Sequence, residues 1–281
     1  MKKILITGAN SYIGTSFEKW VKQWPGQYQV DTIDLIDSTW RETSFKGYDC
    51  VYHVAGIAHL KQTEDNKNLY YKVNRDLAIE VAQRAKVDGV YHFIFLSSMS
   101  VYGIEQGHIT RDTNPNPNCH YGKSKYEAEN VILRLVDENY KISILRPPMV
   151  YGKGCKGNFI KLNQFTNKIS IFPQFINKRS MIHIDNLSEF VRLIIDRSIM
   201  GILCPQNLDY VCTSEMIKAL CISKNRKPII LPGFQNTISF LASKNELFAK
   251  VFGDLTYSQE LSNIGYNYHV NQFNESIERS I

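Results

Sequence analysis

The sequence predicts an α/β protein in which a doubly wound parallel sheet is followed by a smaller C-terminal lobe. Short apolar runs alternate with segments of helical period over the first half of the chain. A glycine-containing loop lies between the first apolar run and the first helical segment. After Gly152 the alternation stops, and no clear strand-helix pattern returns before Arg179. We therefore expect a first domain over residues 1–152 and a lobe over 153–281, with a helix near 185–198 packing back onto the first domain.

The expected elements follow from the apolar pattern. Between the second and third strands, 36–48 is too short for a regular crossover, so we expect an irregular connection that includes Trp40. The stretch 112–118 is rich in proline and asparagine, which predicts a loop bordering a site just before Tyr121. The expected strands are 3–7, 29–34, 50–54, 93–97 and 142–145, and the expected helices lie near 15–22, 77–85, 128–136 and 187–195.

Composition sets outer limits on the class of protein. The 281 residues are 43% hydrophobic and 21% charged, as in ordinary globular proteins. No apolar run approaches the roughly 18 to 20 residues needed to span a bilayer, and only three apolar residues follow the basic start. We expect a cytoplasmic protein without a membrane span. The six cysteines form no Cys-x-x-Cys pair, so we predict reduced thiols and no metal site.

The net charge of +6 has two explanations. It is either a solvated basic surface without a partner, or it attracts a polyanion such as a nucleotide or a membrane surface. No basic run is longer than two residues. This pattern argues against a nucleic-acid groove, so we expect no nucleic-acid partner.

Two glycines frame the loop between the first strand and the first helix. Gly8 and Gly14 let the backbone turn tightly and approach a pyrophosphate, which would lie at the positive end of the helix. Ser11 stands where dinucleotide-binding loops usually have glycine, so the loop has to accommodate one more side chain. An ordinary strand-to-helix turn is the alternative. We predict a dinucleotide site formed by Gly8, Asn10, Ser11, Tyr12, Ile13 and Gly14.

Asp34 stands at the end of the second expected strand, 20 residues after Gly14. A carboxylate here accepts hydrogen bonds from both adenosine ribose hydroxyls and repels a 2′-phosphate. We therefore expect NAD. NADP stays the alternative, because Asp31 and Asp37 lie close by along the chain.

Tyr121 and Lys125 are four residues apart, which places them on one face of a helix, one turn apart. An ammonium group so placed stabilises phenolate and lowers a tyrosine pKa from about 10 toward the range of a general acid or base. Tyr-x-x-x-Lys alone is a common coincidence. Following a nucleotide loop, it becomes a candidate catalytic pair, in which we expect Lys125 to lower the pKa of Tyr121.

Further short blocks occur along the chain in a fixed order: Thr7-Gly8 to Ile13-Gly14, His53-Val54-Ala55-Gly56, Asn74, Leu96 to Gly103, Tyr121 to Lys125, Leu145 to Gly152 and Arg179 to Asp185. Together they resemble the extended branch of the short-chain dehydrogenase/reductase superfamily, which contains nucleotide-sugar epimerases, dehydratases and reductases. The resemblance covers nearly the whole chain. It implies a Rossmann-type first domain and a mainly substrate-binding lobe, with the active site between them.

The resemblance also implies roles for individual residues. Ser98 would hydrogen-bond the reacting sugar oxygen, Tyr121 would exchange its proton, and Lys125 would bind the nicotinamide ribose. Asn74 would join them as a catalytic residue, although a helix-capping asparagine is the alternative. Val54, Ala55, Gly56 and Pro148 would contact the cofactor.

On the substrate side, Arg179 would clamp a diphosphate and Asn158 would lie near it, while an unremarkable surface arginine is the alternative for Arg179. Met149 replaces an asparagine of many relatives. Where 4,6-dehydratases carry an acidic pair, this chain has Met99 and Ser100 beside the substrate, which disfavours dehydration. His183 could be a packed core histidine, and we assign it no role.

These inferences predict an NAD(P)-dependent nucleotide-sugar epimerase, most simply a UDP-hexose 4-epimerase. An NAD(P)H-dependent 4-ketoreductase with the same residues is the alternative, and the short lobe favours it. A non-catalytic regulator that binds dinucleotide is a third reading, which the joint presence of Ser98, Tyr121 and Lys125 disfavours. The resemblance leaves open whether two subunits pair as a homodimer.

Overall fold

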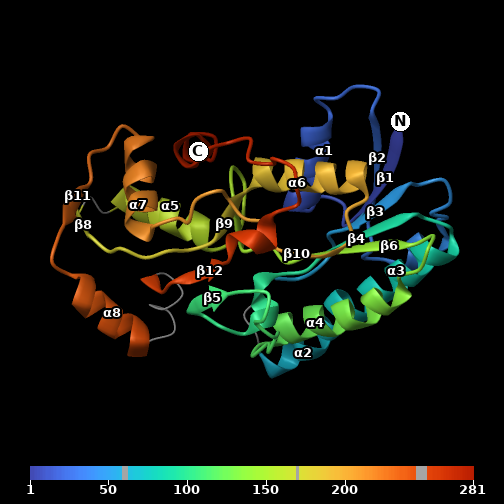
Figure 1. Ribbon diagram of the computed structural model, residues 1–281, viewed down its shortest axis with the longest axis horizontal. Coiled ribbons are helices and arrows are strands. Elements are labelled where there is room, and N and C mark those ends of the chain that lie inside the picture. The colour runs from blue at the N-terminus through green and yellow to red at the C-terminus, as the bar shows by residue number, and fades with distance from the viewer. Residues whose placement is uncertain (59–62, 169–170, 245–251) are drawn as a thin grey trace.

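The computed structural model describes residues 1–58, 63–168, 171–244 and 252–281. In these ranges, a central sheet has six strands in the order β10-β6-β4-β3-β1-β2 (Figure 1). Every neighbouring pair in this sheet is parallel. The strands are β1 (Lys2–Thr7), β2 (Tyr28–Ile33), β3 (Cys50–His53), β4 (His92–Leu96), β6 (Lys141–Leu145) and β10 (Gly201–Leu203).

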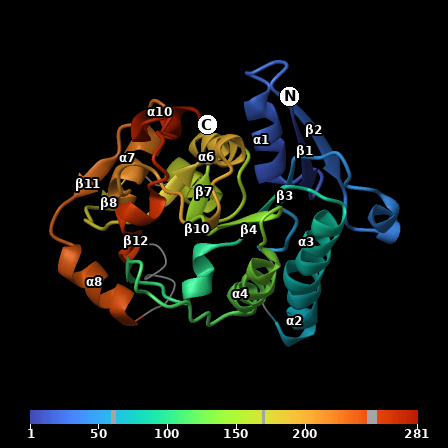
Figure 2. The same ribbon diagram turned by 45° about the vertical axis from the view of Figure 1, so that its right-hand side comes forward.

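Helices cover both faces of this sheet, because its strands are apolar on both sides. Side chains alternate along a strand, so Ile4 and Ile6 face one layer of helices while Leu5 faces the other. The first layer consists of α1 (Tyr12–Val21) and α6 (Ile184–Arg197), and the second contains α3 (Leu77–Val87) and α4 (His120–Ile132) (Figures 1 and 2). The α/β fold expected from the sequence is confirmed.

The strand order reverses between β1 and β3, and this reversal positions the site. From β1 the chain first adds β2 on one side, and then β3, β4, β6 and β10 follow on the other. The connection from β2 to β3 is irregular, with a short 3₁₀ helix (Ser38–Glu42) whose Trp40 is buried. Ligands of open α/β sheets bind at the carboxyl ends of the strands, at such a reversal.

The expected strands lie within two residues of the observed ones, but two expectations were wrong. Helix α1 begins at Tyr12, three residues before the expected start, because Ser11 caps it. Between Gly152 and Arg179 the chain does form regular structure, namely α5 (Asn158–Lys168) and β8 (Ile171–Pro173). Helix α5 escaped notice because polar residues dominate its sequence.

The remaining elements build the lobe and the flank of the site. Short parallel pairs join β7 (Met149–Tyr151) to β9 (Met181–His183), β8 to β11 (Ile229–Leu231), and β5 (Gly107–Ile109) to β12 (Leu255–Tyr257). Helix α6 and strand β10 belong to the central sheet and its helix layer, although both come after residue 152 in the chain. None of the helices in the described ranges is both long and apolar enough to cross a membrane. The other helices are α2 (Glu64–Tyr71), α7 (Thr213–Ile222), α8 (Gln235–Lys244) and α10 (Phe273–Glu278).

Candidate active site

The glycine loop after β1 packs directly on the segment after β3. Gly8 has a φ of +102°, and a Cβ added there would lie 2.9 Å from the backbone nitrogen of Ala55. Only glycine combines this backbone conformation with such a close approach. The structure therefore brings together the two segments that the sequence predicts to hold a dinucleotide.

Ser11, the extra side chain in this loop, caps helix α1. Its Oγ accepts a hydrogen bond of 3.1 Å from the amide of Gly14. A Cβ on Gly14 would lie 2.6 Å from that Oγ and 3.2 Å from a methyl of Val54. No acidic residue occupies the first turn of α1, which leaves its positive end open to an anion. Asn10 precedes the cap in the left-handed conformation, and Tyr12 and Ile13 form the first turn.

Asp34 comes directly after β2 and is exposed beside the glycine loop. The amides of Gly8 and Ala9 both donate to the carbonyl of Ile33, which ties this loop to the end of β2. All three acids have local partners: Asp31 accepts from the Tyr48 hydroxyl, Asp34 from the amide of Ile36, and Asp37 from the amide of Thr39. Of the three, Asp34 is the one at the carboxyl end of β2. These residues together fit a dinucleotide.

Tyr121 lies in the first turn of α4, with its side chain against the turn after β4. A hydrogen bond links the side chains of Tyr121 and Ser98. Burial raises the pKa of Tyr121 to about 12, and the bond with Ser98 offsets this only in part. The expectation that Lys125 lowers the pKa of Tyr121 is therefore wrong for this structure, because burial raises this pKa and Ser98, not Lys125, is the group that lowers it.

Lys125 is buried one turn further along α4. Its Nζ donates a 2.8 Å hydrogen bond to the carbonyl of Leu96, at the end of β4, and lies 4.5 Å from the centre of the Phe95 ring. Burial lowers the pKa of this ammonium group to about 7. Lys125 can therefore hold or release a proton near neutral pH.

Asn74 joins the same cluster from the helix before it. Its amide donates to the carbonyl of Ile57 and to the Ser124 hydroxyl, and its Oδ1 accepts from the amide of Ile57. A Cβ on Gly56 would lie 2.9 Å from Asn74 Oδ1 and 3.2 Å from Lys125 Nζ. Asn74 lies in a π-helical turn (Lys72–Asp76), not at a helix end, so capping does not explain it. Such turns are frequent at functional sites.

A buried ion pair under this cluster was missed in the sequence. Glu129 is four residues beyond Lys125 on α4, and its carboxylate accepts hydrogen bonds from the Arg146 guanidinium at 3.1 and 2.5 Å. The Ser97 hydroxyl also donates to Glu129, which ties α4 to the end of β4. The negative charge of Glu129 raises the pKa of Lys125 against its burial. The position of Glu129 on the apolar face of α4 could have indicated this ion pair, because an acid is almost never fully buried unless it is paired.

The turn after Ser98 carries no acidic side chain. Met99 is buried, its amide donating to the carbonyl of Pro147, and the Ser98 hydroxyl donates to that of Ser100 at 3.2 Å. Pro148, expected to contact the cofactor, is buried just after β6. The arrangement offers a proton carrier and hydrogen-bond donors, with no second acid to expel water from a sugar.

Two of the predicted substrate residues, Asn158 and Arg179, belong to the lobe. Asn158 is exposed at the start of α5, and Arg179 donates through Nη1 to the carbonyl of Gly253 at 2.7 Å. Burial lowers the pKa of Arg179. His183 is a packed residue that caps α6, with its Nδ1 accepting from the amide of Asp185, and burial lowers its pKa to about 4.

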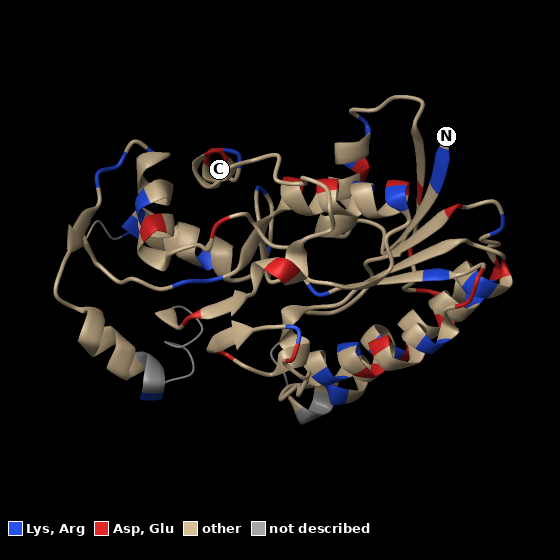
Figure 3. Ribbon diagram, in the orientation of Figure 1, with Lys and Arg blue, Asp and Glu red and all other residues tan. Residues whose placement is uncertain are grey.

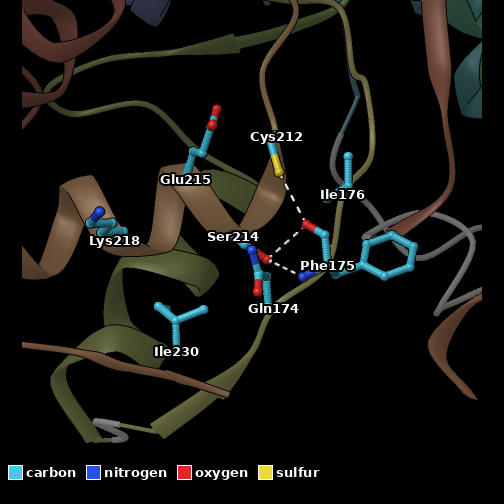
Figure 4. Close-up of a pocket in the computed structure, with 8 residues that line it drawn as sticks. All are labelled: Gln174, Phe175, Ile176, Cys212, Ser214, Glu215, Lys218 and Ile230. Atoms are coloured by element: carbon cyan, nitrogen blue, oxygen red, sulfur yellow. Dashed lines mark hydrogen bonds between the residues drawn. The ribbon is translucent and has the colours of Figure 1, made fainter. Parts of the chain in front are cut away.

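A pocket of about 310 Å³ opens in the lobe between α7 and the β8–β11 pair (Figure 4). The Ser214 hydroxyl anchors one wall, accepting from the amide of Phe175 at 2.9 Å. None of the predicted site residues lines this pocket. No group of three His, Cys, Asp or Glu side chains able to hold a metal occurs within the described ranges.

Comparison with known proteins shows the family. The sequence model of the NAD dependent epimerase/dehydratase family matches residues 4–201. The chain is 29% identical over 280 residues to UDP-glucose 4-epimerase of Vibrio cholerae, covering 90% of this chain and 83% of that one. It is 27% identical over 206 residues to N-acetyl-α-D-glucosaminyl-diphospho-ditrans,octacis-undecaprenol 4-epimerase of Escherichia coli O157:H7, covering 67% of this chain and 62% of that one.

A solved structure agrees in fold over nearly the whole chain. The dTDP-4-dehydrorhamnose reductase of Clostridium acetobutylicum superposes with a TM-score of 0.76 at 19% identity, covering 99% of this chain and 98% of that one. The chain belongs to the NAD-dependent epimerase/dehydratase family and is an NAD(P)-dependent enzyme of the nucleotide-sugar epimerase and reductase class.

Proposed function

We propose that this enzyme interconverts UDP-hexoses that differ at carbon 4. The observation that carries the proposal is the cluster of Ser98, Tyr121 and Lys125 around the end of β4, followed by Met99 and Ser100 where a dehydratase would need acids. The likeness to UDP-glucose 4-epimerase of Vibrio cholerae supports the same reaction.

The side chains of the cluster have different roles in transferring the proton of the sugar hydroxyl. Burial raises the pKa of Tyr121 to about 12, so Tyr121 is a phenol in the resting site and must first release its proton; its phenolate would then accept the proton of the 4-hydroxyl as hydride leaves carbon 4, and would return it when hydride comes back. Lys125, whose pKa burial lowers to about 7, would bind the nicotinamide ribose and, in its charged form, would work against the burial that opposes a phenolate at Tyr121. Ser98 holds the sugar oxygen beside Tyr121. NAD, when bound, supplies the acceptor and donor of hydride at carbon 4.

We propose that NAD lies in the crevice between the loops after β1 and β3. The first turn of α1 would hold the pyrophosphate on its amide groups. Asp34 would accept from the adenosine ribose hydroxyls and oppose a 2′-phosphate. Asn74 would fix the loop at Gly56 and Ile57 so that Lys125 faces the cofactor.

On the substrate side, the common recognition group is a sugar diphosphate. Arg179 would pair with the diphosphate, since a guanidinium binds phosphate oxygens in a bidentate manner. Asn158 would act at the start of α5. The Escherichia coli relative is named for a sugar diphosphate joined to undecaprenol, so we include that class of carrier as a second candidate beside the uridine nucleotide.

The epimerase and the 4-ketoreductase readings differ in how they use the cofactor. With UDP-glucose and catalytic NAD, an epimerase yields UDP-galactose without net change in nicotinamide absorbance. Stoichiometric oxidation of NADPH with a 4-keto sugar nucleotide, and no interconversion of UDP-hexoses, would replace the proposal with its rival. The fold likeness to a dTDP-4-dehydrorhamnose reductase makes this the necessary control.

A further inference from the structure

Positive charge is concentrated in two segments of the lobe. Segments 153–183 and 205–244 together contain eleven Lys or Arg and two Asp or Glu. The other residues of the lobe, 184–204 and 245–281, contain four Lys or Arg and eight Asp or Glu, so the excess belongs to these two segments and not to the whole lobe. Figure 3 shows acidic and basic residues mixed over α3 and α4, and basic residues prevailing around α5 and α7. These two segments therefore present a basic region to any large anion.

An apolar surface lies within this basic region, on the outer face of the β8–β11 pair. Ile171 and Ile229 are register partners and are 53% and 54% exposed. The alternate residues Phe172 and Ile230 face inward, where they pack with Ile217 and Cys221 of α7. The outward set is thus unusual, because strands normally turn polar side chains to water.

Helix α8, which is joined to the segment after β8, adds further exposed apolar side chains to this part of the lobe. Ile238 is the only buried side chain among those of α8 that the structure describes, whereas Phe240 is 63% exposed. The helix is fastened at its start, where the Gln235 side chain bonds both the amide and the carbonyl of Ile176. Ile176 itself is 69% exposed. In Figures 1 and 2, α8 projects from the lobe away from the central sheet.

We propose that this apolar surface docks the lobe on the face of an anionic phospholipid bilayer. The surface, which we term the docking surface, comprises Ile171, Ile176, Ile229, Leu231, Phe234, Phe240 and Leu241. Apolar side chains would enter the headgroup boundary, while exposed lysines around them would pair with anionic lipids. Lys168 and Lys227 precede the paired strands β8 and β11, Lys178 follows β8, and Lys244 ends α8.

Charge selects this occupant over a second copy of the chain. Two lobes meeting through this surface would bring two sets of basic residues together and repel each other. A bilayer rich in anionic lipid supplies both the negative charge and the apolar boundary that the surface requires. For its purpose the inference rests on the second substrate class of the proposed function: docking would bring the enzyme to the membrane that holds a sugar diphosphate carried by a polyprenol.

Vesicle sedimentation tests the docking. We expect the protein to sediment with vesicles of equal parts phosphatidylglycerol and phosphatidylcholine, and not with phosphatidylcholine alone. Raising the ionic strength from about 0.1 M to about 1 M shortens the screening length from about 10 to about 3 Å and should release the protein. Sedimentation that ignores lipid charge and salt would overturn the proposal.

Two variants locate the contact. Phe240→Ser should weaken vesicle binding, and a Lys168→Glu, Lys227→Glu double variant should weaken it at least about tenfold. The matched controls are Val87→Ser on α3, where the side chain is 80% exposed, and Lys46→Glu, exposed on the first domain. Equal losses in the controls would contradict the assigned surface. A concentration-dependent dimer that Phe240→Ser abolishes would assign the surface to a second copy instead.

Turnover of UDP-glucose without vesicles separates this proposal from the proposed function. Phe240→Ser should leave that turnover unchanged. A protein that binds vesicles but converts no UDP-hexose leaves the docking intact and overturns the reaction. A protein that converts UDP-hexoses but fails to bind anionic vesicles supports the reaction and overturns the docking.

Discussion

The crevice at the end of the central sheet and the outer surface of the lobe hold their charges in opposite ways. In the crevice, Glu129 and Arg146 are buried and hydrogen-bonded to each other, and Lys125 is buried with its Nζ bonded to the carbonyl of Leu96. In segments 153–183 and 205–244 of the lobe, eleven basic side chains stand against two acidic ones, and exposed apolar residues lie among them. Buried, paired charges fix geometry at a high cost if broken, whereas exposed charges attract a partner and add little stability. The first arrangement suits chemistry, and the second suits recognition.

The sharpest test of the crevice is Tyr121→Phe. Removing the hydroxyl deletes the proposed proton carrier and preserves the ring that packs edge-on against Tyr70. Turnover of UDP-hexose should fall by about 100- to 10,000-fold, with NAD binding retained. Ser98→Ala should cost less, since it removes one hydrogen bond to the reacting oxygen. Tyr126→Phe, on the same helix, is the control and should retain activity; full activity in Tyr121→Phe would remove Tyr121 from the reaction.

The contrast between buried and exposed charge can be measured with two glutamates. Glu129→Gln leaves Arg146 buried without its ion partner and should lower the free energy of unfolding by about 3 to 5 kcal/mol. Glu275→Gln breaks the exposed pair with Arg279 and should cost less than about 1 kcal/mol. Urea unfolding monitored by circular dichroism gives both values. Equal effects would contradict the contrast between the two regions.

Gly8→Ala tests whether close packing of the glycine loop on the segment after β3 is needed for NAD binding. A methyl group here meets the backbone of Ala55 at 2.9 Å, so the loop must shift away from the segment after β3. NAD affinity, measured by calorimetry, should fall at least about tenfold, which is about 1.4 kcal/mol. Gly26→Ala is a matched control, because its φ is also positive, +80°, but nothing lies within 4 Å of an added Cβ. Equal losses of NAD affinity in the two variants would point to backbone strain alone.

The sequence predicted the crevice better than the lobe, for a physical reason. Buried parallel strands are continuous apolar runs. A glycine between the first strand and the first helix, such as Gly8, indicates a tight turn with a close backbone approach, and residue type alone reveals it. Helix α5 is dominated by polar residues, and the strands of the pairs β8–β11 and β5–β12 are only three residues long, so periodicity is weak there. The pKa of Tyr121 was misjudged because spacing along a helix reveals which charges are near but not how deeply a phenol is buried.

Asp34→Asn tests cofactor choice. Removing the charge weakens acceptance from the ribose hydroxyls and removes repulsion of a 2′-phosphate, so the preference for NAD over NADP should shrink by roughly tenfold. Asp37→Asn should leave the preference unchanged, since Asp37 caps the 3₁₀ helix. Competitive titration of both dinucleotides measures the ratio. A wild-type protein that prefers NADP would exclude Asp34 as the ribose ligand and strengthen the reductase reading.

Lys125 predicts a pH dependence of stability that is confined to one window. Burial lowers its folded pKa from 10.5 to about 7, so the unfolded chain binds more protons between these values. Stability from this group is therefore full above about pH 10.5 and is lost as pH falls toward 7, with a slope of at most about 1.4 kcal/mol per pH unit. Lys125→Met removes the titration and keeps the length of the side chain. The difference in unfolding free energy between cofactor-free wild type and Lys125→Met should then shift in favour of the wild type as pH rises from 7 to 10, because the other titrating groups cancel. A difference that stays constant across this window would show that Lys125 keeps its ordinary pKa, and Tyr121 would then face a full positive charge at every working pH.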